Sequence, residues 1–277
     1  MDTTRIGNVE AIPLVDTTLV MNPRLFLPQV ADQMIAEYPH LLDERENMAM
    51  SVTTYLLRSA GKNVLVDTGL GGRRRSGFPV GHLDESLRAA GLAPGDIDVV
   101  VHTHLHIDHV GWNTIDDGSG NRQIFFPNAT VVVQKREWHY WMQPEHLQEP
   151  ANVHLVECVA PLQNSGRLRF VDGEEAIDEN LTFISTPGHT PGHVSIGVYS
   201  AGERAVVVGD ASHHPAQLDH PDWSPGFDTD PILSAETRDR LFDAAMNDGR
   251  TWLAGHWEYP GIGRIIRLNG KRVFQAL

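Results

Sequence analysis

The stretch VHTHLHIDHVGWNT, residues 101–114, follows a run of valines and crowds metal-capable side chains into a few positions. These side chains are His102, His104, His106, Asp108 and His109. In an extended segment side chains alternate, so His104 and His106 point the same way and can bind one ion. A turn through Ile107 then redirects Asp108 and His109. One short loop can therefore serve two metal ions.

Three more apolar runs, far apart in the chain, also lead to a metal-capable residue. The runs FISTPGH, VVVGD and TWLAGH end at His189, Asp210 and His256. In α/β proteins, ligands gather outside the carboxyl ends of strands, where loops converge. Imidazole and carboxylate without thiolate fit two divalent ions, most simply Zn²⁺, whereas Ca²⁺ and Mg²⁺ prefer mostly oxygen. Any one His could instead be an ordinary hydrogen-bonded residue, but this many buried imidazoles without a ligand would cost stability.

Composition limits the class of protein. The chain has 277 residues, 41% of them hydrophobic and 21% charged, with a formal net charge of -14. This charge disfavours nucleic acid and anionic membranes as partners. A lone cysteine, Cys158, excludes an intrachain disulfide and a thiolate zinc site. The sequence has no export signal at its start and no long apolar run, which predicts a soluble, cytoplasmic protein; a homodimer is left open.

Short Val- and Ile-rich runs, bounded by Gly, Pro, Asp or Asn, recur along the chain and predict strands. We expect strands over 52–57, 64–66, 99–101, 130–133, 181–184, 194–198, 205–208 and 264–268. Helical patterns alternate with them: one runs from His82 to a stop at Gly91, and another from a Ser234 cap to Gly249. Because strands and helices alternate along the whole chain without a linker, the sequence predicts one α/β domain over 1–277. Residues 20–50 fit this scheme poorly and are interpreted as a segment covering a cleft, or as an irregular wrap on the core.

The hexad His104-Leu105-His106-Ile107-Asp108-His109 resembles the HxHxDH signature of the metallo-β-lactamase superfamily. Further landmarks follow in the family's order: Asp-Thr-Gly at 67–69, Pro-Gly-His at 187–189, Gly-Asp at 209–210 and Gly-His at 255–256. The resemblance covers roughly residues 50–268. It implies an αββα sandwich, with two mixed β-sheets flanked by helices and the site at one edge of both sheets.

The resemblance also implies a ligand set. The first metal would be held by His104, His106 and His189, the second by Asp108, His109 and His256, and Asp210 would bridge the two. Asp67 would orient ligands through hydrogen bonds without touching metal. His102 and His193 fall outside the signature and are expected to be structural or to support ligands.

Within the superfamily, GDASHHPAQ and GHWEYPGIGR are similar to the branch of N-acyl-homoserine lactone lactonases and methyl parathion hydrolase-like enzymes. Those lactonases usually carry Tyr three residues after the bridging Asp, where this chain has His213. True β-lactamases often place a Cys ligand at the position of Asp210. Members that process nucleic acid carry large extra domains.

The expected activity is hydrolysis of a small lactone or carboxylic ester by a metal-bridging hydroxide, which two close metal ions make available near neutral pH. Asp108 is the expected proton shuttle and His213 a second donor. Apolar side chains would select the substrate, and the candidates are Met21, Phe26, Trp112, Trp223 and Phe227. A phosphotriester hydrolase on the same site is the alternative, because it needs the same nucleophile. A non-catalytic metal-binding protein is the second alternative.

Overall fold

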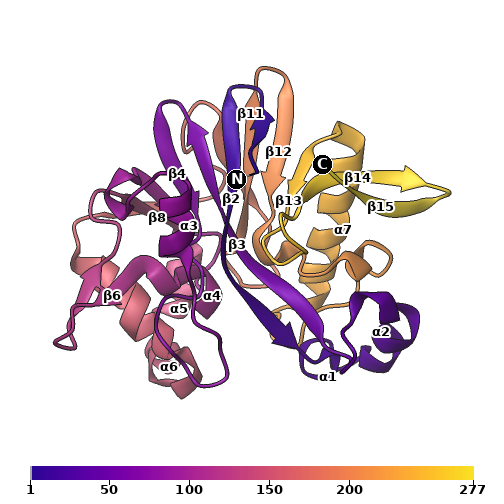
Figure 1. Cartoon of the computed structure of the whole chain (residues 1–277), viewed down its shortest axis with the longest axis horizontal. Coiled ribbons are helices and arrows are strands. Elements are labelled where there is room, and N and C mark those ends of the chain that lie inside the picture. Colours follow the sequence, from indigo (N-terminus) through magenta and orange to yellow (C-terminus); the bar gives the residue numbers. More distant parts are fainter. Residues whose placement is uncertain (1) are drawn as a thin grey trace.

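The structure is a computed structural model that describes residues 2–277, and two β-sheets pack face to face within it with helices outside (Figure 1). The larger sheet comprises, in order, β1 (Thr4–Ile6), β2 (Val9–Met21), β3 (Met48–Ser59), β4 (Lys62–Val66), β5 (Val99–Val101), β8 (Thr130–Gln134) and β9 (Leu168–Val171). The smaller comprises β10 (Leu181–Ser185), β11 (Val194–Ser200), β12 (Glu203–Val207), β13 (Thr251–Leu253), β14 (Ile262–Leu268) and β15 (Lys271–Ala276). A separate hairpin pairs β6 (Thr114–Asp116) with β7 (Arg122–Ile124). The predicted αββα sandwich is confirmed.

Parallel pairing at the centre of each sheet fixes where the strands end. In the larger sheet Val66, Val101 and Val132 lie side by side at the carboxyl ends of β4, β5 and β8. In the smaller sheet Val207 of β12 pairs with Leu253 of β13. Because these pairs are parallel, the segments that follow them leave from the same edge of each sheet.

The central strands are mostly apolar where they pair, because both faces of each sheet are covered there. In β12, Ala205 and Val207 face the other sheet, whereas Val206 faces the helix α7 (Pro231–Asp248). Likewise Val101 packs between the sheets, and Val100 packs under the helices on the outer face of the larger sheet. Three apolar layers result, and they hold the strand ends rigidly.

The remaining helices are short. They are α1 (Pro23–Phe26), α2 (Ala31–Glu37), α3 (Leu83–Ala89), α4 (Ile107–Val110), α5 (Lys135–Trp141) and α6 (Pro144–Gln148), with 3₁₀ turns η1 (Pro39–Leu41), η2 (Pro94–Asp96), η3 (Gly111–Asn113), η4 (Pro150–Asn152), η6 (Ala160–Asn164), η7 (Gly209–Ala211) and η8 (Pro215–Leu218) and a π turn η5 (Leu155–Val159). The helix predicted from His82 corresponds to α3. In the described part of the chain, 2–277, no helix has the length and apolar character needed to cross a membrane.

The prediction of a Ser234 cap is wrong, because α7 begins three residues earlier. Asp230 caps the helix by accepting the Leu233 N–H at 3.0 Å. Pro231 follows at the first helical position, where its missing N–H needs no partner. Ser234 instead is buried and accepts a hydrogen bond from Arg238 at 2.9 Å. The predicted stop is confirmed: Gly249 has φ 62° and ends the helix.

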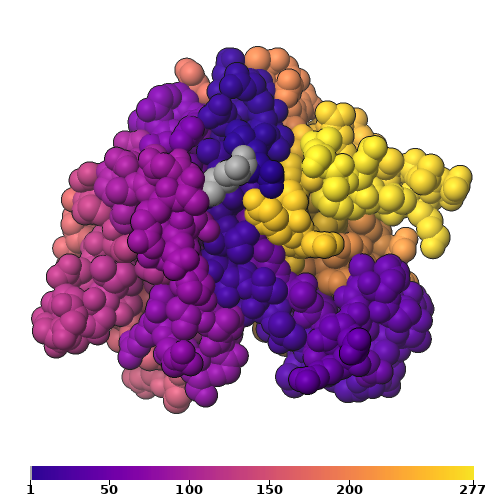
Figure 2. Space-filling view, viewed as in Figure 1, coloured from indigo at the N-terminus to yellow at the C-terminus, as the bar shows by residue number. Residues whose placement is uncertain are grey.

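The segment 20–50 contains the end of β2, the helices α1 and α2, the turn η1 and the start of β3. Phe26, Met34, Met48 and Trp223 form a separate apolar cluster that joins this segment to the loop after β12. Figure 2 shows a hollow at the lower edge of the molecule between these indigo helices and the magenta-to-pink part of the chain. The segment therefore stands beside the edge where the strands end.

Candidate metal centre

Three residues of the candidate centre occupy equivalent places in the fold. His104, Asp210 and His256 each lie three residues after the last residue of a central strand, namely Val101, Val207 and Leu253. His189 follows β10 in the smaller sheet, and Asp108 and His109 lie in α4, the turn expected at Ile107. Convergence of both sheets at one edge thus brings together residues from four distant parts of the sequence.

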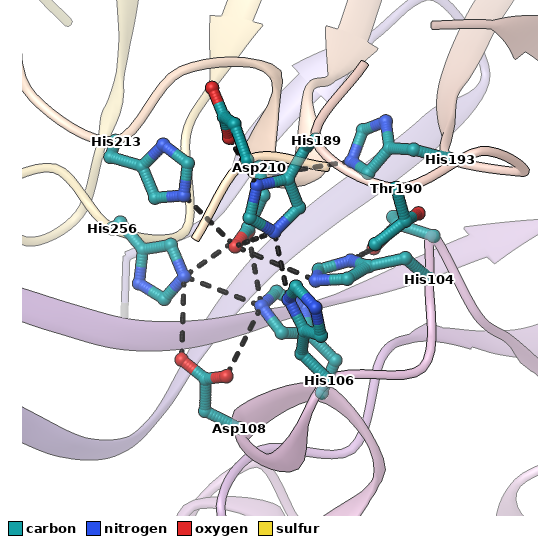
Figure 3. A network of polar contacts seen from close by, with 12 residues as sticks. His104, His106, Asp108, His189, Thr190, His193, Asp210, His213 and His256 are labelled. Atoms are coloured by element: carbon teal, nitrogen blue, oxygen red, sulfur yellow. Dashed lines mark hydrogen bonds and ion pairs between the residues drawn. The ribbon is translucent and has the colours of Figure 1, made fainter. Parts of the chain in front are cut away.

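Asp210 lies at the centre of this group (Figure 3), and its two carboxylate oxygens lie near different sets of imidazoles. Oδ2 is 3.2 Å from His189 Nε2 and 3.6 Å from His104 Nε2. Oδ1 is 3.0 Å from His109 Nε2 and 3.2 Å from His256 Nε2. One carboxylate thus faces two separate groups of nitrogen atoms.

The ligand atoms form two clusters, each with its atoms within 4.8 Å of one another. The first contains His104, His106, His189 and Asp210, and the second contains Asp108, His109 and His256. His106 Nδ1 lies 2.8 Å from His189 Nε2, and His256 Nε2 lies 3.6 Å from Asp108 Oδ2. The structure therefore brings together in space the seven residues predicted as ligands.

The chemistry of these atoms fits a pair of divalent ions. His104 Nε2 and Asp210 Oδ1 are buried without a hydrogen-bond partner among the described residues. Burial and neighbouring imidazoles hold the pKa of His104 and of His106 well below the usual value, so both rings are neutral and present lone pairs. Buried, unpartnered nitrogen and oxygen atoms are costly unless an ion binds them.

Carboxylates behind the cluster orient two of its imidazoles. Asp67 accepts from His109 Nδ1 at 2.9 Å, and Asp228 accepts from His189 Nδ1 at 2.7 Å. A backbone oxygen, that of Ser51, does the same for His256 at 2.8 Å. These hydrogen bonds hold each Nδ1 on the side away from the cluster and direct each Nε2 into it. Asp67 thus lies where it was predicted, whereas Asp228 was missed.

The charge of the Asp210 carboxylate and the charges of the surrounding imidazoles stabilise one another. Burial opposes charge on His189, but the carboxylates of Asp210 and Asp228 outweigh burial and raise its pKa to about 9. Burial likewise opposes charge on Asp210, but His109 and His256 outweigh it and hold the pKa of Asp210 well below the usual value. Asp210 is therefore ionised.

The two histidines outside the signature support the site from behind. His193 Nε2 accepts from the backbone N–H of Asp210 at 2.9 Å. Burial lowers the pKa of His193 to about 3, which keeps this nitrogen an acceptor. His102 lies behind Asp67, with Nδ1 3.5 Å from Asp67 Oδ1 and Nε2 3.0 Å from Asn113 Oδ1.

A cavity of about 220 Å³ opens onto the cluster. Asp108, His213 and His256 lie at its polar end, and its apolar wall consists of Leu19, Met21, Met50, Phe78, Ile107 and Phe227. Of the residues predicted to select the substrate, Met21 and Phe227 therefore line this cavity.

The other three do not line the cavity. Trp112 is buried in the core of the larger sheet and donates from Nε1 to Asp16 at 2.7 Å. Phe26 is fully buried behind His213, with ring centroids 5.4 Å apart. Trp223 is buried and stacks on His220. Each large ring is needed to fill space between elements, which the local sequence did not reveal.

Comparison with known proteins identifies the family. Residues 48–115 and 120–256 match the model of the Metallo-beta-lactamase superfamily. An N-acyl homoserine lactonase from Bacillus sp is 26% identical over 229 residues, 76% of this chain and 83% of the relative.

Two solved structures have the same architecture. The crystal structure of AbOPH, a hydrolase in the beta lactamase superfamily, superposes with a TM-score of 0.86 at 29% identity. The superposition covers 99% of this chain and 96% of the AbOPH chain. The structure of AidC, a dizinc quorum-quenching lactonase in complex with a product, superposes with a TM-score of 0.82 at 24% identity. That superposition covers 100% of this chain and 97% of the AidC chain. The predicted resemblance to lactonases is confirmed. This chain belongs to the metallo-β-lactamase superfamily.

Proposed function

We propose that the chain, a metal-dependent hydrolase of ester bonds, opens the ring of a neutral lactone that carries an apolar substituent. The observation that carries this proposal is the position of Asp210 between two ligand clusters at the end of a largely apolar cavity. The curated relatives named as N-acyl homoserine lactonases support the same substrate class.

The first ion would be held by His104, His106 and His189, and the second by Asp108, His109 and His256, with Asp210 shared. Zn²⁺ suits these nitrogen and oxygen donors best. Such a pair, when bound, supplies Lewis acidity for the substrate carbonyl and water acidic enough to attack near neutral pH.

The chain's own residues then handle protons and position. Asp108 belongs to the second cluster and also lines the cavity where a substrate would bind, with a side chain that is 15% exposed. Asp108 can take a proton from the attacking water and deliver it to the oxygen that leaves as the ring opens. His213 lines the same wall and donates from Nε2 toward Asp210 Oδ2 at 3.1 Å, which places a second donor near the developing charge.

The lining of the cavity indicates a neutral substrate. Within the described residues 2–277, no Lys or Arg lines this cavity, so an anionic group would meet no positive side chain. Apolar side chains from β2, β3 and the loop at Phe78 would instead bury an acyl chain or an aromatic ring. This distinguishes the chain from an enzyme that must bind a carboxylate or phosphate on its substrate.

Turnover tests this proposal. The zinc-loaded chain is assayed against N-acyl homoserine lactones of short and long acyl chains, simple γ-lactones, nitrophenyl esters, a paraoxon-type triester and a β-lactam. We expect the highest kcat/KM on a lactone. Faster hydrolysis of the triester would favour the phosphotriesterase alternative, and metal retention without turnover on any of them would favour a non-catalytic protein. Cytoplasmic location and a homodimer stay predictions.

A further inference from the structure

Glu137 is a buried carboxylate that belongs to no metal-binding motif of the sequence. It lies in the first turn of α5, directly after the buried strand β8, and its residue is 1% exposed. A carboxylate this deep is costly unless donors surround it. Four donors do so: the Leu105 N–H at 3.1 Å, Trp141 Nε1 at 2.7 Å, Thr190 Oγ1 at 2.7 Å and the Gly192 N–H at 2.9 Å.

The donors come from the two loops that carry the first ligand cluster. Glu137 Oε1 accepts from Leu105, which separates His104 from His106 in the sequence. Glu137 Oε2 accepts from Thr190, the residue directly after His189, and from Gly192. A single side chain therefore ties the loop of the larger sheet to the loop of the smaller sheet. Figure 3 shows Thr190 beside His104 and His189.

The close approach of the second loop to α5 depends on a glycine. A Cβ at Gly192 would lie only 2.2 Å from the backbone nitrogen of Glu137. Any larger residue would push the loop, and His189 with it, away from the helix. The contact at Gly192 limits how closely the second loop can approach α5, and the hydrogen bonds to the Glu137 carboxylate keep the loop from moving away.

Trp141 provides a second connection to the same cluster. Its Nε1 donates to Glu137, and its ring packs edge-on against the imidazole of His106 with centroids 5.1 Å apart. Glu137 therefore holds in place the indole that supports His106 from outside the cluster.

We infer that Glu137 is a positioning residue for the first metal ion, acting through Leu105, Thr190, Gly192 and Trp141 on the three imidazoles that would hold it. The inference rests on the proposed two-ion site, and it adds that Glu137 helps to set the affinity for the first ion. The imidazole of His109 in the second cluster is oriented by Asp67 instead. We therefore expect Glu137 to affect the affinity for the first ion and not the affinity for the second.

The test uses Co²⁺ bound to the full chain, measured by competition with a chelator and by the visible d–d spectrum. Two backgrounds isolate the ions: His256→Ala weakens the second site, and His189→Ala weakens the first. In the His256→Ala background we expect Glu137→Gln to weaken the remaining ion by about 10- to 100-fold, the range for residues that support metal ligands, and to change its spectrum. In the His189→Ala background we expect a change of less than about threefold.

A milder pair of variants covers the case in which Glu137→Gln fails to fold. Thr190→Val removes one donor at almost constant volume, and Thr190→Ser restores the hydroxyl. We expect about tenfold weaker Co²⁺ binding in the first and recovery in the second. Asp16→Asn is the matched control, because Asp16 is equally buried and accepts from Leu70, Leu83 and Trp112 rather than from the two histidine loops. It should lower stability and leave the first ion's affinity unchanged.

Two results would overturn the inference. The first is equal weakening of Co²⁺ binding by Glu137→Gln in both backgrounds, and the second is native affinity and an unchanged spectrum in Thr190→Val. If the native chain bound no Co²⁺ at all, the proposed function would fail as well. If the native chain bound two ions and Glu137→Gln bound them as tightly, only the role of Glu137 would fail.

Discussion

The imidazole of His213 lies parallel to that of His256, with an interplanar angle of 4° and ring centroids 5.6 Å apart. His256 belongs to the second ligand cluster, whereas His213 faces Asp210 Oδ2 at 3.1 Å. Burial lowers the pKa of His213 to about 4, so the ring is neutral at pH 7 and can donate one proton. His213 is thus placed to donate a hydrogen bond beside the cluster without being needed in either group of ligands.

The variant His213→Phe separates these roles. The phenyl ring keeps the packing against Phe26 and Phe227 but has no polar atom. We expect unchanged metal content and a kcat on the preferred lactone lowered by about 10², the lower end of what a positioned proton donor contributes. The control is His213→Gln, which restores a donor and should recover part of the rate. A native kcat in His213→Phe would remove His213 from the mechanism.

Metal content tests the shared carboxylate. Because Asp210 faces both clusters, Asp210→Asn should weaken both ions, whereas His109→Ala should release only the second. Elemental analysis after gel filtration measures this, with His139→Ala, an exposed histidine on α5, as the control. Circular dichroism confirms that each variant is folded. Native metal content and native turnover in both variants would contradict the dinuclear assignment.

The position of the ligand residues could be predicted because each of them follows an apolar run that forms a strand. Each of the runs before His104, Asp210 and His256 is apolar up to the strand end, and the ligand follows at the same offset. The partners behind the cluster gave no such signal. Asp228 reaches His189 across 39 positions, and Glu137 reaches Gly192 across 55, so only tertiary folding brings them together.

The long strand β2 was also absent from the sequence prediction. Pro13 interrupts its pattern, and the pairing with β3 shifts between Val15 and Thr17, around the buried Asp16. A shift of one residue moves side chains to the opposite face, so no alternation of period two runs through the strand. Residues 20–50 contain only short helical elements between β2 and β3, namely α1, α2 and η1.

Phe227 offers a test of the apolar wall. It lines the cavity and is 42% exposed, so a substrate chain can cover it. Phe227→Ala should raise KM for long-chain lactones by roughly fivefold, equivalent to about 1 kcal/mol for a partly buried ring, and change short-chain substrates little. The matched control is Phe170→Ala, since Phe170 is 43% exposed but packs on Trp138 in the other layer. An equal effect of both variants would argue against an acyl-chain wall at Phe227.

Two glycines with nearly the same positive φ allow the cost of backbone strain to be measured apart from the cost of close packing. Gly69 has φ 64° and Gly249 has φ 62°. A Cβ at Gly69 would lie 2.5 Å from Asp16 Oδ2, whereas one at Gly249 would meet nothing within 4 Å. We expect Gly249→Ala to lower the free energy of unfolding by about 1 kcal/mol and Gly69→Ala by about 3 kcal/mol, from strain alone and from strain plus overpacking. Urea unfolding measures both, and equal losses would show that the contact with Asp16 is relieved without cost.

We expect acid stability to depend on His214, which is buried and accepts the Ala216 N–H at Nδ1. Burial, and then the neighbouring His213, lower its pKa from 6.5 to about 4. The folded chain therefore keeps this ring neutral, and its contribution to stability is complete above pH 6.5 and is lost as the pH falls toward 4.

Between pH 7 and pH 5 this single group should reduce the free energy of unfolding by about 2 kcal/mol. His214→Gln keeps an acceptor that does not titrate, so the variant should lose about 2 kcal/mol less than the native chain over the same interval. Urea unfolding at both pH values measures the difference. His139→Gln, at an exposed position, is the control and should behave as the native chain does. An identical pH dependence in His214→Gln and the native chain would show that His214 is protonated without cost in the folded state.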